Sequence, residues 1–127
     1  FLEVPPQWLA RAELVVARAG ATTLAEIACE GVAAVLVPYP YATDDHQRAN
    51  AGWYADRGGA RVVEESDGFT KLVAGLADEV GTLLRSESTR RKLAGAIKEL
   101  AQPDATSAVV AVVSEVLGVD LSRSRAA

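Results

Sequence analysis

The sequence predicts an α/β fold, a Rossmann-like parallel sheet flanked by helices, with a helical C-terminal segment. Two short apolar runs, Leu14-Val-Val-Ala17 and Ala33-Ala-Val-Leu-Val37, are continuous rather than alternating. Such runs are typical of parallel strands that are covered on both faces. Helical patterns alternate with the strands through short links, and this order favours right-handed βαβ units.

The first of these helices should follow a glycine turn at Gly20. Thr23-Leu-Ala-Glu26 matches a capping box, so we expect the helix to begin near Thr22 or Thr23. It should end at Gly31, because glycine readily adopts the left-handed conformation that terminates a helix.

A loop with two prolines leads from the second strand to the next helix. Residues 38–45 form this loop, and Thr43 or Asp44 could cap the helix, which should end at Gly58-Gly59. Ala60-Arg-Val-Val63 is expected to be a third short strand. In such sheets ligands bind at the carboxyl ends of strands, where the loops at 18–23 and 38–45 must both lie.

The rest of the chain is helical in pattern, with three apolar stripes that we expect to face a core. The stripes comprise Leu72, Val73, Leu76, Ala77, Val80, Leu83 and Leu84; then Leu93, Ile97 and Leu100; then Ala105, Ala108, Val109, Val112, Val113, Val116 and Leu117, ending at Gly118. The basic residues Arg90-Arg-Lys92 and Lys98 are expected on solvated faces. Residues 1–118 should form one domain, and 119–127 a frayed tail.

Composition excludes several classes of protein. A net charge of -4 gives no electrostatic reason to expect nucleic acid as a partner. The single cysteine, Cys29, cannot form an internal disulfide and is expected to be a buried structural thiol. No apolar run approaches the ~20 residues of a membrane span. Because the chain has no methionine and begins at Phe1, we expect a piece of a longer polypeptide.

The segment from Arg18 to Glu26 is the strongest candidate for a binding site. A strand, a glycine turn and a helix start would present backbone N–H groups and a positive dipole end to a phosphate. Thr22 and Thr23 could assist, Glu26 could bind a ribose, and Arg18 could face the phosphate or pair with an acid. The alternative is that Gly20 only shapes a turn and Glu26 only closes the capping box.

A second polar cluster, Thr43-Asp-Asp-His-Gln-Arg-Ala-Asn50, should lie beside the same edge of the sheet. Gln47 and Asn50 share a helix face and could recognise a sugar. Asp44, Asp45 and His46 would be weak metal ligands, and His46 a weak general base. A capped, solvated helix start is the alternative. Nearby, Trp53 is expected in the core, and Tyr39 and Tyr41 could pack on a ligand or stiffen the loop.

The stretches Glu13–Glu26 and Val37–Ala51 together resemble the carboxy-terminal domain of the MurG family, two-domain GT-B type glycosyltransferases that transfer N-acetylglucosamine in peptidoglycan synthesis. The first reads Glu-Leu-Val-Val-Ala-Arg-Ala-Gly-Ala-Thr-Thr-Leu-Ala-Glu. The second reads Val-Pro-Tyr-Pro-Tyr-Ala-Thr-Asp-Asp-His-Gln-Arg-Ala-Asn-Ala. The resemblance extends from about Phe1 to Leu117 and implies one half of a GT-B fold.

The resemblance implies a donor site for UDP-N-acetylglucosamine, with no metal and no cofactor bound tightly. The diphosphate would contact Arg18, Gly20, Ala21, Thr22 and Thr23. Glu26 would bind the ribose, and His46, Gln47 and Asn50 would contact the sugar. Many family members have two glutamines where this chain has His46-Gln47.

The same resemblance implies that no catalytic residue lies in this chain. The acceptor, a lipid-linked muramyl pentapeptide, would bind an amino-terminal domain of the same polypeptide at the inner face of the bacterial plasma membrane, in the cytoplasm. The chain alone should therefore bind nucleotide without catalysing transfer. An apolar face left bare by that domain could drive self-association. The alternatives are another UDP-sugar glycosyltransferase and a non-catalytic Rossmann-like partner module.

Overall fold

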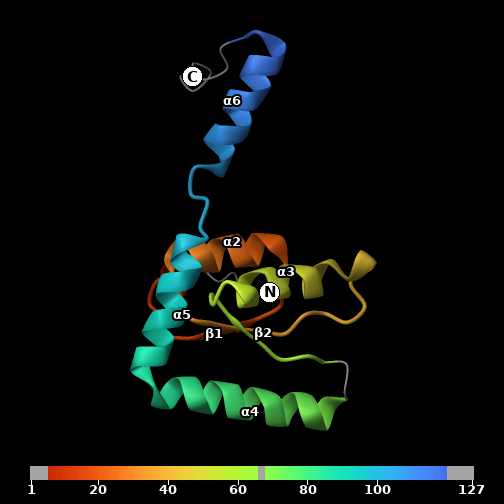
Figure 1. Cartoon of the computed structure of the whole chain (residues 1–127), viewed down its shortest axis with the longest axis vertical. Coiled ribbons are helices and arrows are strands. Elements are labelled where there is room, and N and C mark those ends of the chain that lie inside the picture. The colour runs from red at the N-terminus through yellow and green to blue at the C-terminus, as the bar shows by residue number, and fades with distance from the viewer. Residues whose placement is uncertain (1–5, 66–67, 120–127) are drawn as a thin grey trace.

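The computed structural model describes residues 6–65 and 68–119, and a sheet of three parallel strands lies at its centre (Figure 1). The strands β1 (Val15–Ala17), β2 (Ala34–Leu36) and β3 (Arg61–Val62) are neighbours in that order. The predicted α/β class and the parallel sheet are confirmed. Because all three strands run in one direction, the loops that follow them meet at one edge of the sheet.

Helices cover both faces of this sheet (Figure 1). After the short α1 (Pro6–Leu9), the crossover helices α2 (Ala21–Glu30) and α3 (His46–Asp56) lie on one face, and α4 (Phe69–Arg85) lies on the other. The helix α5 (Glu87–Glu99) contacts both α2 and α4 and closes one side of the sheet.

The central strand β2 is fully buried because its side chains alternate between two apolar clusters. Ala34 and Leu36 face the cluster formed with α2, α3 and α5. Val35 faces the second cluster, which holds Leu83 of α4 and Leu93 of α5. This alternation explains why the sequence of the strand is a continuous apolar run.

The helix α2 begins at Ala21, earlier than its capping box predicted. Gly20 is the N-cap, with the extended angles φ -71° and ψ 141°, and no side chain caps the helix. This start is within one or two residues of the predicted one near Thr22 or Thr23, but the capping box is not the cap, because Gly20 already has the conformation that an N-cap requires. Gly31 ends the helix with φ 70°, as predicted.

The start of α3 also differs from the prediction. Residues Thr43–Asp45 form a short 3₁₀ turn, η1, in which Asp44 and Asp45 both have a φ of 53°. The helix then begins at His46 without a side-chain cap, so neither Thr43 nor Asp44 caps it. Aspartate tolerates the left-handed region better than most residues, which permits this sharp entry.

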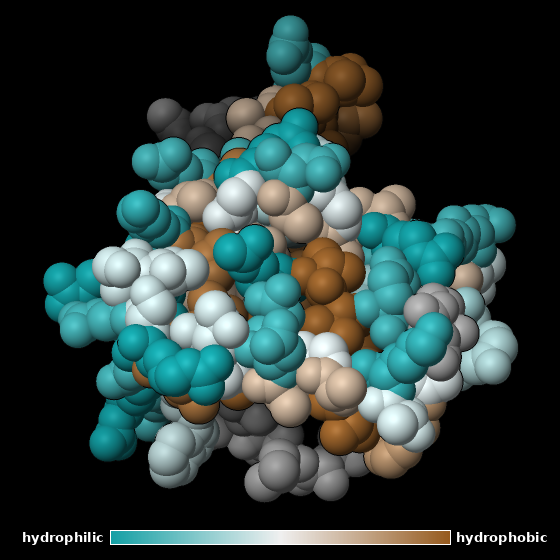
Figure 2. All heavy atoms as spheres, turned by 60° about the horizontal axis from the view of Figure 1, so that its bottom comes forward, coloured by the Kyte–Doolittle hydropathy of each residue, from teal (hydrophilic) through white to brown (hydrophobic). Residues whose placement is uncertain are grey.

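The last helix, α6 (Ala105–Leu117), projects away from the rest of the structure (Figure 1). Its apolar stripe was expected to face a core, but none of its residues is buried. Hydrophobic side chains gather on the surface at this end of the molecule (Figure 2). The periodic pattern predicted the helix correctly, but it carried no information on which surface the apolar side of the helix would contact. The predicted tail lies, from residue 120 onwards, outside the described residues.

Two basic residues of α5 hold the fold together rather than lying free in solvent. Arg90 is 13% exposed and donates hydrogen bonds to the carbonyls of Leu83 and Leu84 and to Glu13. The Lys98 ammonium donates to the carbonyl of Cys29. The expectation of a solvated side chain was wrong at Arg90, because the carbonyls at the end of α4 need donors, whereas Lys98 is exposed as expected.

No helix within the described residues is long and apolar enough to cross a membrane.

Adjacent leucines on α4 provide a matched test of this packing. Leu83 is fully buried, whereas Leu84 is 58% exposed although the same stripe contains both. We expect Leu83→Ala to lower the free energy of unfolding by about 2–5 kcal/mol, because a cavity replaces a packed side chain. Leu84→Ala should change it by less than about 0.5 kcal/mol. Urea denaturation measures both, and equal losses would contradict the described orientation of α4.

Candidate functional site

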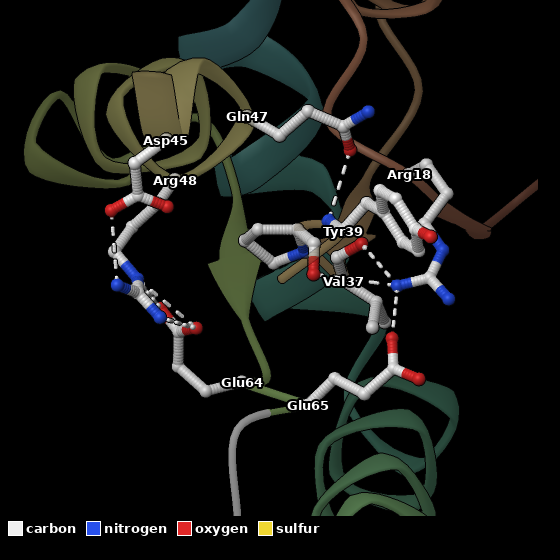
Figure 3. Close-up of polar contacts among 9 residues, drawn as sticks. Arg18, Val37, Tyr39, Asp45, Gln47, Arg48, Glu64 and Glu65 are labelled. Atoms are coloured by element: carbon white, nitrogen blue, oxygen red, sulfur yellow. Dashed lines mark hydrogen bonds and ion pairs between the residues drawn. The ribbon is translucent and has the colours of Figure 1, made fainter. Parts of the chain in front are cut away.

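Side chains at the carboxyl edge of the sheet tie the three strand-end loops together (Figure 3). Arg18, which follows β1, donates from Nη1 to the carbonyls of Val37 and Pro38, both at 3.3 Å, in the loop after β2. The same nitrogen forms an ion pair with Glu65, which follows β3. One guanidinium therefore links the ends of all three strands. Of the two expectations for Arg18, a phosphate or an acidic partner, the structure shows the acidic partner.

Gln47 and Asn50 reach from α3 back to the loop after β1. The Gln47 Oε1 accepts hydrogen bonds from the backbone N–H groups of Ala19, at 3.2 Å, and Tyr39, at 3.0 Å. Asn50 donates from Nδ2 to the carbonyl of Ala19 at 3.1 Å. Ala19 is fully buried, so both of its backbone polar groups obtain partners that water cannot supply.

Arg48 lies between these two residues in the sequence and forms two ion pairs of its own. Its guanidinium contacts Glu64 at 3.3 Å and Asp45 at 3.0 Å. The hydrogen bond to Glu64, followed by the charge of Asp45, raises the pKa of the Arg48 guanidinium. The two ion pairs hold the start of α3 against the segment that follows β3.

His46 is exposed at the first position of α3. Its Nδ1 lies 2.6 Å from the carbonyl oxygen of Thr43. A carbonyl can only accept a hydrogen bond, so Nδ1 must carry the proton, and the neutral ring then presents Nε2 as an acceptor. Around it, the described residues contain no group of three or more potential metal ligands.

The first turn of α2 has backbone N–H groups without intrahelical partners. Leu24 is the first residue of the helix whose N–H bonds back, to the Gly20 carbonyl at 3.0 Å. Ala21, Thr22 and Thr23 precede it, all three are exposed, and no side chain caps them. An open helix N-terminus of this kind attracts an anion through its N–H groups and its dipole.

Glycine at position 20 is not required by the fold. Its φ of -71° is accessible to any residue, and a Cβ added there would meet no atom within 4 Å. A Cβ here would meet only open space at the start of α2. Glycine commonly serves this purpose where a ligand approaches the backbone closely.

Two hollows flank this turn. The larger, about 620 Å³, lies between α2 and β1 and is lined by Thr22, Thr23 and Glu26 together with apolar atoms of residues 15–17. The smaller, about 190 Å³, lies on the α3 side and is lined by Ala21, Leu24, Asn50, Trp53 and Tyr54. Burial, followed by the charge of Cys29, raises the pKa of the Tyr54 phenol.

The structure thus brings most of the predicted site residues to the start of α2. Some of them are free to meet a ligand, and others already bind neighbouring loops. Thr22, Thr23 and Glu26 are exposed around one hollow, and within the described residues no partner holds the Glu26 carboxylate. Arg18, Gln47 and Asn50 bind neighbouring loops.

Two predictions of burial near the site were wrong. Trp53 is 44% exposed and stacks with the Arg57 guanidinium, whose carbon lies 4.2 Å from the ring centroid. Cys29 is half-buried and lines the larger hollow. Both side chains lie on helix surfaces that no further described element covers, which a helical pattern alone does not reveal.

The residue patterns also left out Glu64 and Glu65, the acidic partners of Arg48 and Arg18. A signal for them was present, since two acids directly follow the third apolar strand. The carboxyl ends of parallel strands share one edge, so these acids had to lie near Arg18.

Comparisons with known proteins agree with this geometry. A family model described as the glycosyltransferase family 28 C-terminal domain matches residues 1–105. Curated proteins named UDP-N-acetylglucosamine–N-acetylmuramyl-(pentapeptide) pyrophosphoryl-undecaprenol N-acetylglucosamine transferase are similar. The one from Paraburkholderia phymatum is 44% identical over 98% of this chain and 32% of its own length. The one from Levilactobacillus brevis is 40% identical over 85% and 29%.

A solved structure is also similar. The crystal structure of Acinetobacter baumannii MurG superposes with a TM-score of 0.78 and 36% identity, covering 91% of this chain and 32% of that one. This likeness identifies the three-stranded sheet and its helices as part of a GT-B glycosyltransferase fold. The chain spans about a third of the length of the relatives it matches.

Substitutions at Arg18 and Glu65 separate the ion pair from the other contacts of the guanidinium. Glu65→Gln should cost less than about 1 kcal/mol of unfolding free energy, because both side chains are partly exposed, at 31% and 47%. Arg18→Met should cost more, about 1–2 kcal/mol, since two loop carbonyls also lose their donor. Urea denaturation distinguishes these values, and equal costs would show that the carbonyl contacts contribute nothing.

Proposed function

Because the chain belongs to the glycosyltransferase family 28 C-terminal domain family, we propose that it is the donor-binding half of an inverting glycosyltransferase. The enzyme moves N-acetylglucosamine from UDP-N-acetylglucosamine to a lipid-linked muramyl pentapeptide in peptidoglycan synthesis. The names of the similar curated proteins support this donor and this acceptor.

The single observation that carries the proposal is the open N-terminus of α2. Its N–H groups have no side-chain cap, and Gly20, the residue before them, has open space where a Cβ would lie. Thr22, Thr23 and Glu26 line the adjoining hollow of about 620 Å³. A diphosphate fits the N–H groups and the dipole, and a ribose on the Glu26 side would offer hydroxyl donors to an otherwise unpartnered carboxylate.

The reaction chemistry favours such a site. The leaving group is UDP, whose diphosphate gains negative charge as the glycosidic bond breaks. Fixed N–H donors and a helix dipole stabilise that growing charge without reorganising during the reaction. Arg18 could add a positive charge nearby, although Glu65 and two carbonyls already share its guanidinium.

The α3 residues would face the sugar. His46 can present Nε2 as an acceptor, and Gln47 keeps its Nε2 amide for a ligand because its Oε1 is already used. Sugar hydroxyls satisfy both kinds of group, since each can donate and accept.

The other half of the enzyme would supply the remaining machinery. We place the general base and the acceptor site in an amino-terminal domain of the same polypeptide, at the inner face of the plasma membrane. The chain by itself would then bind nucleotide without turnover. Transfer from UDP-N-acetylglucosamine to the lipid acceptor by these 127 residues alone would contradict that division of roles.

Nucleotide binding tests the proposal directly. UDP should raise the melting temperature, because a ligand at about 100 times its Kd stabilises the folded state by roughly 2.7 kcal/mol. Uridine, which lacks the diphosphate, should stabilise far less at equal concentration. Absence of a shift with either UDP or UDP-N-acetylglucosamine at millimolar concentration would overturn the donor site.

Gly20→Ala is the matched variant for this measurement. The backbone at this position accepts alanine, but alanine is a poorer N-cap than glycine, so the two effects oppose each other and the free energy of unfolding should change by less than about 1 kcal/mol. Its Cβ would occupy the space of the diphosphate, so UDP affinity should fall. Unchanged UDP affinity in this variant would show that the diphosphate does not bind at this turn.

Glu26 and Glu30 form a matched pair of acids one turn apart on α2, both exposed at the larger hollow. Glu26→Ala should weaken UDP binding but change the free energy of unfolding by less than about 0.5 kcal/mol, because no described residue holds the carboxylate. Glu30→Ala should affect binding much less. Calorimetry measures the UDP affinity and urea denaturation measures the free energy of unfolding. A loss of stability with unchanged UDP affinity would show that Glu26 has only a structural role.

A further inference from the structure

Ala19 is held from both sides by side chains of α3. Its N–H donates to Gln47 Oε1, and its carbonyl accepts from Asn50 Nδ2. The chemistry of these backbone groups fixes the orientation of both amides, since an N–H can only meet an oxygen and a carbonyl can only meet an NH₂ group. Ala19 is completely buried, so water does not compete for either bond.

These two bonds fix two successive peptide planes immediately before Gly20. The N–H of Ala19 belongs to the plane shared with Arg18, and its carbonyl belongs to the plane shared with Gly20. Gly20 is the N-cap of α2 and has no side chain to hold it in place. The direction in which the first N–H groups of α2 point therefore depends on how Ala19 is held.

We propose that Gln47 and Asn50 are positioning residues for the diphosphate of the donor, acting through Ala19 on the open N-terminus of α2. The inference rests on the proposed donor site and adds a second role to residues expected to contact only the sugar. Within the described residues Gln47 Nε2 and Asn50 Oδ1 have no hydrogen-bond partner and could contact a ligand, while the other ends of both amides hold the turn. Contacts with the sugar and placement of the diphosphate site are therefore coupled through the same two side chains.

A ligand without the sugar separates positioning from direct recognition. We would measure affinities of UDP and UDP-N-acetylglucosamine by calorimetry for wild type, Gln47→Met and Asn50→Ala. Positioning predicts that both variants lose affinity for UDP itself, by about tenfold, which is the effect of one lost hydrogen bond. If UDP affinity stays within twofold of wild type while only UDP-N-acetylglucosamine binds more weakly, the side chains read the sugar alone and the proposal is overturned.

Amide hydrogen exchange tests the same contacts without any ligand. Gln47→Met should speed exchange at Ala19 and Tyr39, whose N–H groups lose their acceptor, and at Ala21 and Thr22 if the turn moves. Gln47→Glu keeps an acceptor oxygen and should restore the protection of Ala19 and Tyr39. Unchanged exchange in Gln47→Met would overturn the positioning role regardless of the nucleotide results.

Leu72→Ala is the control for loss of stability alone. Leu72 packs on the α4 face of the sheet, opposite the face that α2 covers, and its truncation should leave UDP affinity unchanged. A tenfold loss in this variant would overturn the inference, because general loosening would then explain the others. Failure of wild type to bind UDP would instead overturn the proposed function and this inference with it.

Discussion

The structure depends on hydrogen bonds that cross the carboxyl edge of the parallel sheet. Parallel strands end side by side, so their loops crowd together and their backbone polar groups are removed from water. One amide oxygen of Gln47 serves two of these loops through Ala19 and Tyr39, and one Arg18 nitrogen serves the ends of all three strands. The edge is therefore held by side chains, while the sheet beneath it is held by backbone hydrogen bonds and apolar packing.

The first turn of α2, like the start of α3, has no side-chain cap within the described residues. Its exposed N–H groups follow Gly20, where an added Cβ would meet no atom within 4 Å. Rigid surroundings around an unsatisfied helix start are what an anion site requires, because the donors are already oriented before the ligand arrives. The acids Glu64 and Glu65 offset the charges of Arg48 and Arg18 beside it. The dipole and N–H groups of α2 would then be the main attraction for the diphosphate of the proposed donor.

The same physical reasoning explains which predictions succeeded. The strands and helices followed from apolar runs and periodicity, which are local properties of the chain. Helix ends at Gly31, Gly58 and Gly118 also followed, because each adopts a positive φ that glycine tolerates. The capping box at Thr23–Glu26 failed because the glycine before it supplied the cap geometry. The apolar stripe of α6 failed as a core element because periodicity does not identify the surface that a helix meets.

The sequence by itself determined the α/β class, the order of the elements and the neighbourhood of the candidate site, since these depend on local pattern and on the geometry of parallel strands. It also contained the two motifs that indicate a glycosyltransferase donor domain. Only the tertiary structure decided how Gln47 and Asn50 are used. Their partners, Ala19 and Tyr39, are as many as 31 residues away and offer backbone groups that every residue type shares. No sequence pattern distinguishes these backbone groups from those of other residues. Only the folded structure therefore shows which of them bind Gln47 and Asn50.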